Sequence, residues 1–98
     1  MSSKANFHIG EIVEHTQFGY RGVIFDVHDE FELTDEWYEK TANSRPPKDR
    51  PWYHILVHNA AHTTYVAQQN LETIEDSEQI NHPELGKYFR SFIDGKYK

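Results

Sequence analysis

The chain has 98 residues, no cysteine and a formal net charge of −6 at pH 7. This length makes one domain with a modest core, and the lack of cysteine excludes disulfides, thiol catalysis and thiolate metal sites. The acidic balance disfavours non-specific binding to DNA or anionic membranes, and no stretch approaches the roughly 20 apolar residues that cross a bilayer.

Residues 1–6 carry one lysine and no apolar run, so they do not read as a signal peptide. We therefore expect a flexible tail on a cytoplasmic protein. Two strands are expected next, over residues 7–15 and 20–28, because both segments are rich in β-branched and aromatic residues. Gly10 interrupts the first of them and predicts a bulge or a close backbone approach.

Residues 29–51 form a long insertion that breaks the strand pattern. Its first half is acidic with embedded aromatic side chains, and Thr34 could cap a short helix that ends near Ala42. Its second half is rich in proline, which no regular element tolerates at this spacing. A loop this long inside a small domain is usually functional or mobile.

The densest run of strand-forming residues is 51–58, and we expect it at the centre of a small sheet. Its odd-numbered residues are all apolar, whereas the even-numbered ones mix Trp52 and Leu56 with two histidines. Alternation along a strand therefore predicts one core face and one partly wet face. Further strands are expected over residues 63–67 and 71–75, joined by a tight turn at residues 68–70.

The C-terminal segment is predicted to be a helix over residues 81–95. Asn81 and Glu84 have the spacing of a capping box, Pro83 suits the first turn, and Gly95 suits the end. An apolar stripe at helical spacing follows the start: Leu85, Tyr88, Phe89, Phe92 and Ile93.

Together these elements predict a mainly β, single domain over residues 1–98. The expected architecture is a small SH3-like five-stranded barrel, with the long loop between strands 2 and 3 and the C-terminal helix over an open edge or one mouth. A two-layer α+β sheet with the helix across one face is the alternative.

Four ordered blocks of the sequence carry a family resemblance. They run from Phe7 to His15, from Gly19 to Asp26, from Pro51 to His54 and from Thr64 to Leu71, and together they resemble the heat-shock protein HspQ, or YccV-like, family. The resemblance implies an SH3-like barrel and a bacterial cytoplasmic regulator, described as binding hemimethylated DNA. It also implies a link to heat shock and to the Lon protease, as substrate and as enhancer. It brings no catalytic motif, so we expect no catalytic residue and no cofactor.

A small set of basic and aromatic residues is the candidate DNA-binding site: Arg21, Arg45, Lys48, Arg50 and Trp52. Phosphate neutralisation supplies most of the affinity for DNA, and a hemimethylated site also needs an apolar contact for its single methyl group. The alternative interpretation is a solvated loop, with the aromatic ring in the core.

A second set is the candidate protein-binding site: Phe31, Trp37, Tyr38 and Tyr97. The first three are aromatic anchors in the acidic insertion, and the last lies in the accessible C-terminal tail. The alternative is an ordinary solvated insertion beside a packed tail; an exposed C-terminal stripe would instead mark a homo-oligomer contact. Histidines recur at 54, 58 and 62, but four residues along a strand span roughly 13 Å, so we expect no metal site there.

Two functional hypotheses follow. In the first, the chain is a non-enzymatic adaptor that modulates Lon-dependent degradation by contacting the protease or its substrates. In the second, it is a DNA-binding module that reads hemimethylation.

Overall fold

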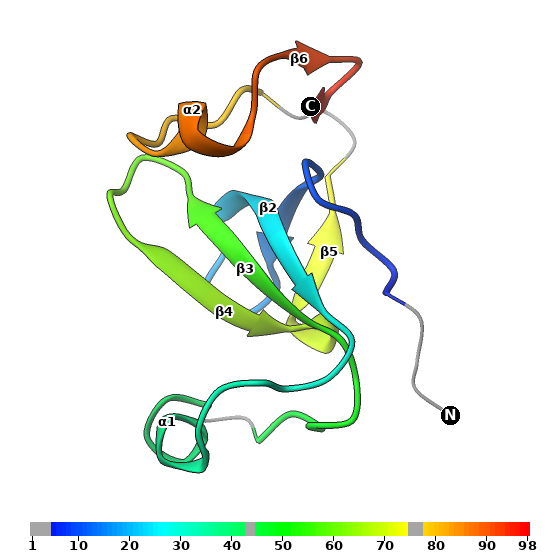
Figure 1. The fold of residues 1–98 in the computed structure, drawn as a ribbon, viewed down its shortest axis with the longest axis vertical. Coiled ribbons are helices and arrows are strands. Elements are labelled where there is room, and N and C mark those ends of the chain that lie inside the picture. The colour runs from blue at the N-terminus through cyan, green and yellow to red at the C-terminus, as the bar shows by residue number, and fades with distance from the viewer. Residues whose placement is uncertain (1–4, 43–44, 75–77) are drawn as a thin grey trace.

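The computed structural model describes residues 5–42, 45–74 and 78–98. Five antiparallel strands form one sheet in the order β4-β3-β2-β1-β5 (Figure 1). The strands are β1 (Ile12–His15), β2 (Arg21–His28), β3 (Trp52–Val57), β4 (Thr63–Ala67) and β5 (Leu71–Thr73). The expected mainly β architecture and its five strands are confirmed, and a single 3-10 turn, η1 (Gln68–Asn70), stands where the tight turn is predicted.

Two details of the predicted sheet are wrong. The middle strand is β2, and β3 lies one place from the edge. Among the described residues no strand pairing joins β4 to β5, so the sheet is open and does not close into a barrel. The SH3-like arrangement stays a prediction. No helix within the described ranges has the length and apolar character to cross a membrane.

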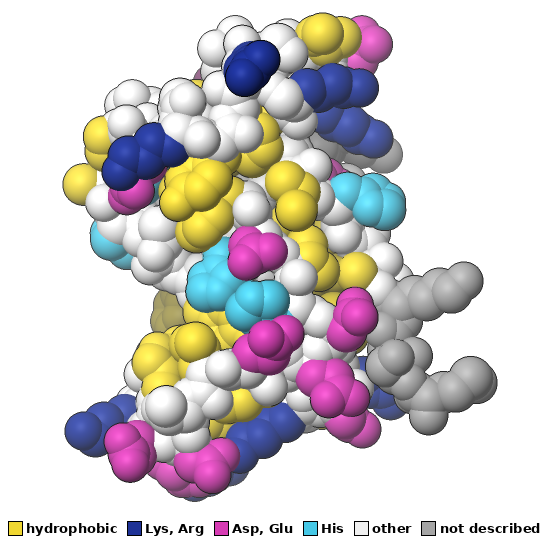
Figure 2. Space-filling view, in the orientation of Figure 1, with side chains coloured by type: hydrophobic (Ala, Val, Ile, Leu, Met, Phe, Trp, Pro, Cys, Tyr) yellow, Lys and Arg dark blue, Asp and Glu magenta, His cyan; other side chains and the backbone are white. Residues whose placement is uncertain are grey.

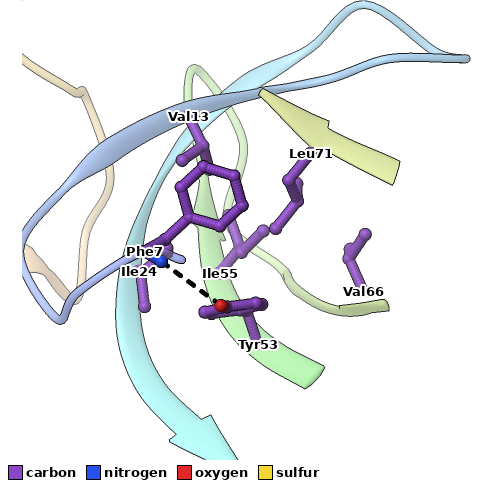
Figure 3. Close-up of a cluster of buried hydrophobic side chains, with 7 residues drawn as sticks. All are labelled: Phe7, Val13, Ile24, Tyr53, Ile55, Val66 and Leu71. Carbon is purple, nitrogen blue, oxygen red and sulfur yellow. Dashed lines mark hydrogen bonds between the residues drawn. The ribbon is translucent and has the colours of Figure 1, made fainter. Parts of the chain in front are cut away.

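The sheet buries both of its faces. One face carries the cluster shown in Figure 3: Phe7, Val13, Ile24, Tyr53, Ile55, Val66 and Leu71. The opposite face carries a second cluster: Ile12, Val23, Leu56, Ile80, Phe89 and Tyr97. The face of β3 expected to be partly wet is drier than predicted: Trp52 is 1% exposed and Leu56 is fully buried, and only the two histidines are partly exposed. The insertion covers Trp52, and the C-terminal segment covers Leu56. His54 lies between these two residues on the same face and remains half-buried.

The first strand is shorter than predicted because Gly10 redirects the chain. Gly10 has φ +92°, and its carbonyl accepts a hydrogen bond of 2.8 Å from the Tyr97 N–H. A Cβ at this position would overlap the Tyr97 carbonyl oxygen, so the expected close backbone approach is confirmed. Of the expected tail, residues 1–4 lie outside the described part of the chain, and the Asn6 N–H donates to Gln68 Oε1 at 2.8 Å.

The insertion holds the helix that Thr34 was expected to cap. Helix α1 spans Asp35–Thr41, and the Thr34 hydroxyl accepts a hydrogen bond of 3.1 Å from the Trp37 N–H. The proline-rich half is irregular over residues 45–51, as predicted, and residues 43–44 lie outside the described part. In Figure 1 the insertion projects from one end of the sheet, opposite the C-terminal segment.

The predicted helix over residues 81–95 is wrong. Helix α2 covers only Leu85–Tyr88, and an antiparallel pair follows, β6 (Phe92–Ile93) and β7 (Lys96–Tyr97). Asp94 and Gly95 join the pair with φ +53° and +78°, the geometry of a type I′ hairpin turn, for which Asp-Gly is a preferred sequence. The apolar residues of this segment have helical spacing, so the sequence pattern predicts a helix. In the structure Phe92 instead pairs with Tyr97 across the hairpin.

Gly22 gives a direct test of how tightly β2 and β3 pack. A Cβ there would overlap the Ile55 side chain and lie 2.6 Å from the Leu56 carbonyl oxygen. We expect Gly22→Ala to lower the free energy of unfolding by about 1–3 kcal/mol through overpacking. Gly86 in α2 has open space around it, so Gly86→Ala is the matched control and should stay within about 1 kcal/mol of wild type. Urea unfolding measures both, and an unchanged midpoint for Gly22→Ala would contradict the described contact.

Candidate functional site

An aromatic cluster fixes the insertion to the sheet. It consists of Phe31, Trp37, Tyr38, Trp52 and Tyr65. Trp52 and Tyr65 stack with ring centroids 5.2 Å apart, and the Phe31 ring lies 5.0 Å from Trp52. Two polar atoms of the cluster reach the proline-rich segment: Trp52 Nε1 donates to the Pro47 carbonyl at 3.1 Å, and the Tyr38 hydroxyl donates to Pro46 at 2.6 Å. Burial of large rings with satisfied polar atoms makes this a rigid unit.

A groove of about 430 Å³ opens between the insertion, strand β4 and the turn that joins β1 to β2. The aromatic cluster contributes Trp37, Trp52 and Tyr65 to its wall. Two apolar side chains of the groove are exposed, Phe18 at 73% and Leu33 at 37%. Exposed apolar groups around a concave, aromatic wall are typical of a binding surface.

The backbone of β4 borders this groove as an open sheet edge. Val57 N–H donates to the His62 carbonyl and Gln68 N–H donates to the Pro51 carbonyl, so the hydrogen-bonded pairs with β3 fall on even-numbered residues of β4. The N–H and C=O groups of Thr63 and Tyr65 therefore point away from β3, toward the open edge. Such an edge can accept an additional strand.

The turn between β1 and β2 is held in place by His15. Its Nδ1 accepts hydrogen bonds from the N–H groups of Gln17 and Phe18, at 3.1 and 3.2 Å. Its ring lies 4.7 Å from that of Phe18, and burial lowers the pKa of His15 below the ordinary value of 6.5. The Tyr20 hydroxyl bonds to Thr64 Oγ1 at 2.8 Å and thereby links the start of β2 to β4. This part of the groove was not predicted from the sequence. The one feature that indicates it there is an apolar residue, Phe18, inside a turn.

The structure does not bring the residues predicted to bind DNA together into one site. Arg45 makes a two-point ion pair with Glu39 at 2.6 and 3.0 Å, and Lys48 Nζ lies 2.9 Å from Asp35 and over the Tyr38 ring. The Arg45 guanidinium lowers the pKa of Glu39, as expected for a paired carboxylate.

The remaining basic residues lie elsewhere. Arg21 donates to the Glu78 carbonyl at 3.3 Å, and Arg50 borders a second pocket of about 400 Å³ with Asn6 and Gln68. Trp52 is in the core, as the alternative interpretation of the sequence has it.

The residues predicted to bind protein lie in two separate clusters. Phe31, Trp37 and Tyr38 belong to the aromatic cluster, and Trp37 lines the groove. Tyr97 lies in the cluster on the C-terminal side of the sheet, 6% exposed, where its hydroxyl accepts a hydrogen bond of 2.7 Å from the Ile80 N–H.

Metal-ligand side chains come together at one place in the described residues. Asp26, His28 and His54 have ligating atoms within 4.8 Å of one another. His58 and His62 do not join them: His58 Nδ1 accepts from the Asn81 N–H at 2.8 Å, and the His62 carbonyl contacts His82 Nε2.

The fold and the groove define a small, mainly β domain that presents an aromatic surface beside an open strand edge, an arrangement suited to binding. The chain belongs to the family described as hemimethylated DNA-binding protein YccV like, whose model matches residues 5–96. This confirms the family inferred from the four sequence blocks.

Curated relatives of the chain include F-box only protein 21 from several mammals. The proteins from Homo sapiens and Pongo abelii are 32% identical over 93 residues, and the one from Mus musculus is 31% identical over the same length. The match covers 93% of this chain and 15% of each relative, so the chain corresponds to one small part of those proteins.

His15 makes the stability of the groove sensitive to acid. Its pKa is lowered in the folded state, so above pH 6.5 the His15 ring is neutral in both the folded and the unfolded protein. Below that pH the ring takes up a proton first in the unfolded protein. The stabilisation is therefore fully present above pH 6.5 and is lost as the pH falls through the folded-state pKa. We expect His15→Asn, which keeps a hydrogen-bond acceptor but does not titrate, to be less stable at pH 7.5 and to lose less stability on acidification to pH 5.

Urea unfolding at several pH values measures this difference. His54 and His58 also have lowered pKa values from burial, so the comparison between wild type and variant is the informative quantity. Parallel pH profiles for the two proteins would show that His15 does not contribute.

Proposed function

We propose that this chain is a cytoplasmic, non-enzymatic regulatory protein that modulates Lon-dependent protein degradation through protein–protein contacts. The partner is Lon, a protein that Lon degrades, or both. The observation that carries the proposal is the groove beside β4, an apolar and aromatic concavity next to an unpaired strand edge. An SH3-like arrangement of the strands, as the resemblance implies, would suit such a module.

The groove supports recognition of an extended peptide segment. A partner strand laid along β4 would pair with the outward N–H and C=O groups of Thr63 and Tyr65, and main-chain pairing of this kind gives affinity without dependence on sequence. Side chains that alternate along that strand would meet Phe18 and Leu33 at the rim and Trp37 on the wall. Rigid aromatic residues of this kind commonly supply most of the binding energy at an interface.

The electrostatics of the insertion favour a protein partner over DNA. Arg45 and Lys48 are each paired with a carboxylate of α1, and Asp35 and Glu36 in the first turn of that helix are exposed. Residues 29–51 carry seven Asp or Glu residues against four Lys or Arg residues, so the insertion presents mostly negative charge beside the groove. An extended segment that combines apolar and basic residues fits both features.

Degradation of a Lon substrate by the purified protease tests the proposal. We expect the wild-type chain to change the rate of substrate loss, and Phe18→Ser and Leu33→Asp each to remove at least half of that change. Both side chains are exposed, so the variants should fold normally. Ile93→Ser is the matched control, because Ile93 is 51% exposed and lies in β6, outside the groove. Equal effects of all three variants, or no effect of wild type, would contradict the groove as the docking site.

Hemimethylated DNA recognition is the second candidate function, and the family description is the observation that favours it. DNA would have to contact Arg21, Arg45, Lys48 and Arg50 from different parts of the surface, and would compete with Glu39 and Asp35 for two of them. Trp52 lies in the core and would act only by supporting the insertion.

A salt titration separates the two functions. We expect duplex DNA to bind only at low salt, since affinity that depends on phosphate contacts falls steeply as counterions compete. Fluorescence anisotropy with hemimethylated, fully methylated and unmethylated duplexes measures this. At low salt, the charge reversal of Arg45, Lys48 and Arg50 to Glu should weaken binding at least tenfold more than the same reversal of Lys87, Arg90 and Lys98. A hemimethyl preference that persists at physiological salt would put DNA recognition first.

A further inference from the structure

Two neighbouring strands place three metal-ligand side chains on one face of the sheet. Asp26 and His28 stand two residues apart on β2, so their side chains share a face, and Asp26 pairs with His54 of β3. Figure 2 shows histidine side chains side by side near the middle of this view, bordered by acidic side chains. One ligating atom from each of the three residues lies within 4.8 Å of the other two.

The contacts of His28 orient its ring for coordination. Its Nδ1 lies 2.9 Å from the Tyr65 hydroxyl, and its Nε2 lies 3.5 Å from Asp26 Oδ2. Metal-bound histidines nearly always hydrogen-bond through the other ring nitrogen, which fixes the ring and its tautomer. Tyr65 is itself fixed, since it stacks on Trp52 and its hydroxyl accepts from the Glu32 N–H at 3.1 Å.

His54 is held in a comparable way. Its ring lies 4.5 Å from that of Tyr65 and 5.0 Å from that of His28, and it is half-buried between the two structural clusters on this face. Glu32 places a carboxylate oxygen 3.8 Å from His28 Nδ1, on the side of the ring away from Asp26. The site therefore combines two oriented imidazoles, one carboxylate directed at them and a second carboxylate nearby.

We propose that Asp26, His28 and His54 bind a divalent transition-metal ion, with Zn²⁺ the best-matched probe. Zinc takes histidine nitrogen and carboxylate oxygen at about 2.0–2.2 Å, which places tetrahedral ligand atoms about 3.3 Å apart. Asp26 Oδ2 already lies 3.5 Å from His28 Nε2, close to that separation, and the Asp26 side chain is half exposed, which leaves it room to adjust. Two neutral imidazoles and a carboxylate suit zinc, nickel or copper better than calcium or magnesium, which prefer oxygen ligands.

Three protein ligands leave at least one coordination position for water or for a side chain of a partner. The ion would join β2 to β3 and, through Tyr65, would fix the aromatic cluster that forms the groove wall. Metal binding is independent of whether the groove accepts a peptide, so its test does not depend on the proposed function.

Calorimetric titration of the untagged, chelator-treated chain with Zn²⁺ tests the proposal. We expect saturable one-to-one binding that His28→Gln, His54→Gln and Asp26→Asn each weaken at least tenfold. His8→Gln is the control, because His8 is an exposed histidine outside the cluster. Circular dichroism verifies that each variant folds; if His54→Gln does not, the variants at the more exposed Asp26 and at His28 decide.

Cobalt substitution gives a second readout. Co²⁺ bound to the wild-type chain should show the strong visible absorption of a low-coordinate site, and the Asp26→Asn, His28→Gln double variant should lose it. Equal Zn²⁺ affinity in His28→Gln and His8→Gln would overturn the proposal. So would several weak sites shared among the seven histidines, or no saturation up to about 1 mM.

Discussion

The burial of Trp52 between the insertion and strand β4 is the interaction on which the rest of the structure depends. Trp52 begins β3, stacks on Tyr65, and donates its indole N–H to the Pro47 carbonyl. Because the indole is almost wholly removed from water, it anchors a segment whose own sequence is too acidic and too rich in proline to fold alone. Without that contact the even-numbered face of β3 would be half wet, and neither the wall of the groove nor the fixed position of Tyr65 would exist.

The same packing explains why the basic residues of the sequence suggest a DNA site, whereas the shape of the surface suggests a peptide site. In the sequence the insertion looks like a basic loop beside an acidic helix, but folding the loop against α1 brings Arg45 and Lys48 each to a carboxylate. Exposed ion pairs of this kind contribute little to stability, yet they remove positive potential that a phosphate backbone would need. What remains accessible is an apolar concavity beside an open strand edge, and this surface is chemically closer to a peptide site than to a DNA site.

Strand positions, the Thr34 cap and the family could be predicted from the sequence, because each depends on residues close together in the chain. The C-terminal hairpin could not be predicted because Leu85, Phe89 and Phe92 have helical spacing, and because Gly95 is equally suited to the end of a helix. The groove and the His28–His54 pair depend on register: a shift between Ile24 and Asp26 sets which residues of β2 face β3, and no local pattern encodes it. Phe18 and Leu33 likewise come to line one groove only after the sheet has formed.

The pairing of Tyr97 with Gly10 has a consequence for how the domain assembles. It joins segments near opposite ends of the chain, and the Tyr97 ring completes the cluster that covers Val23 and Leu56. Contacts so distant in sequence close a large loop, whose entropy must be lost before the contact is gained, and they slow folding relative to local contacts. During synthesis the face that carries Val23 and Leu56 would therefore stay incompletely covered until Tyr97 becomes available.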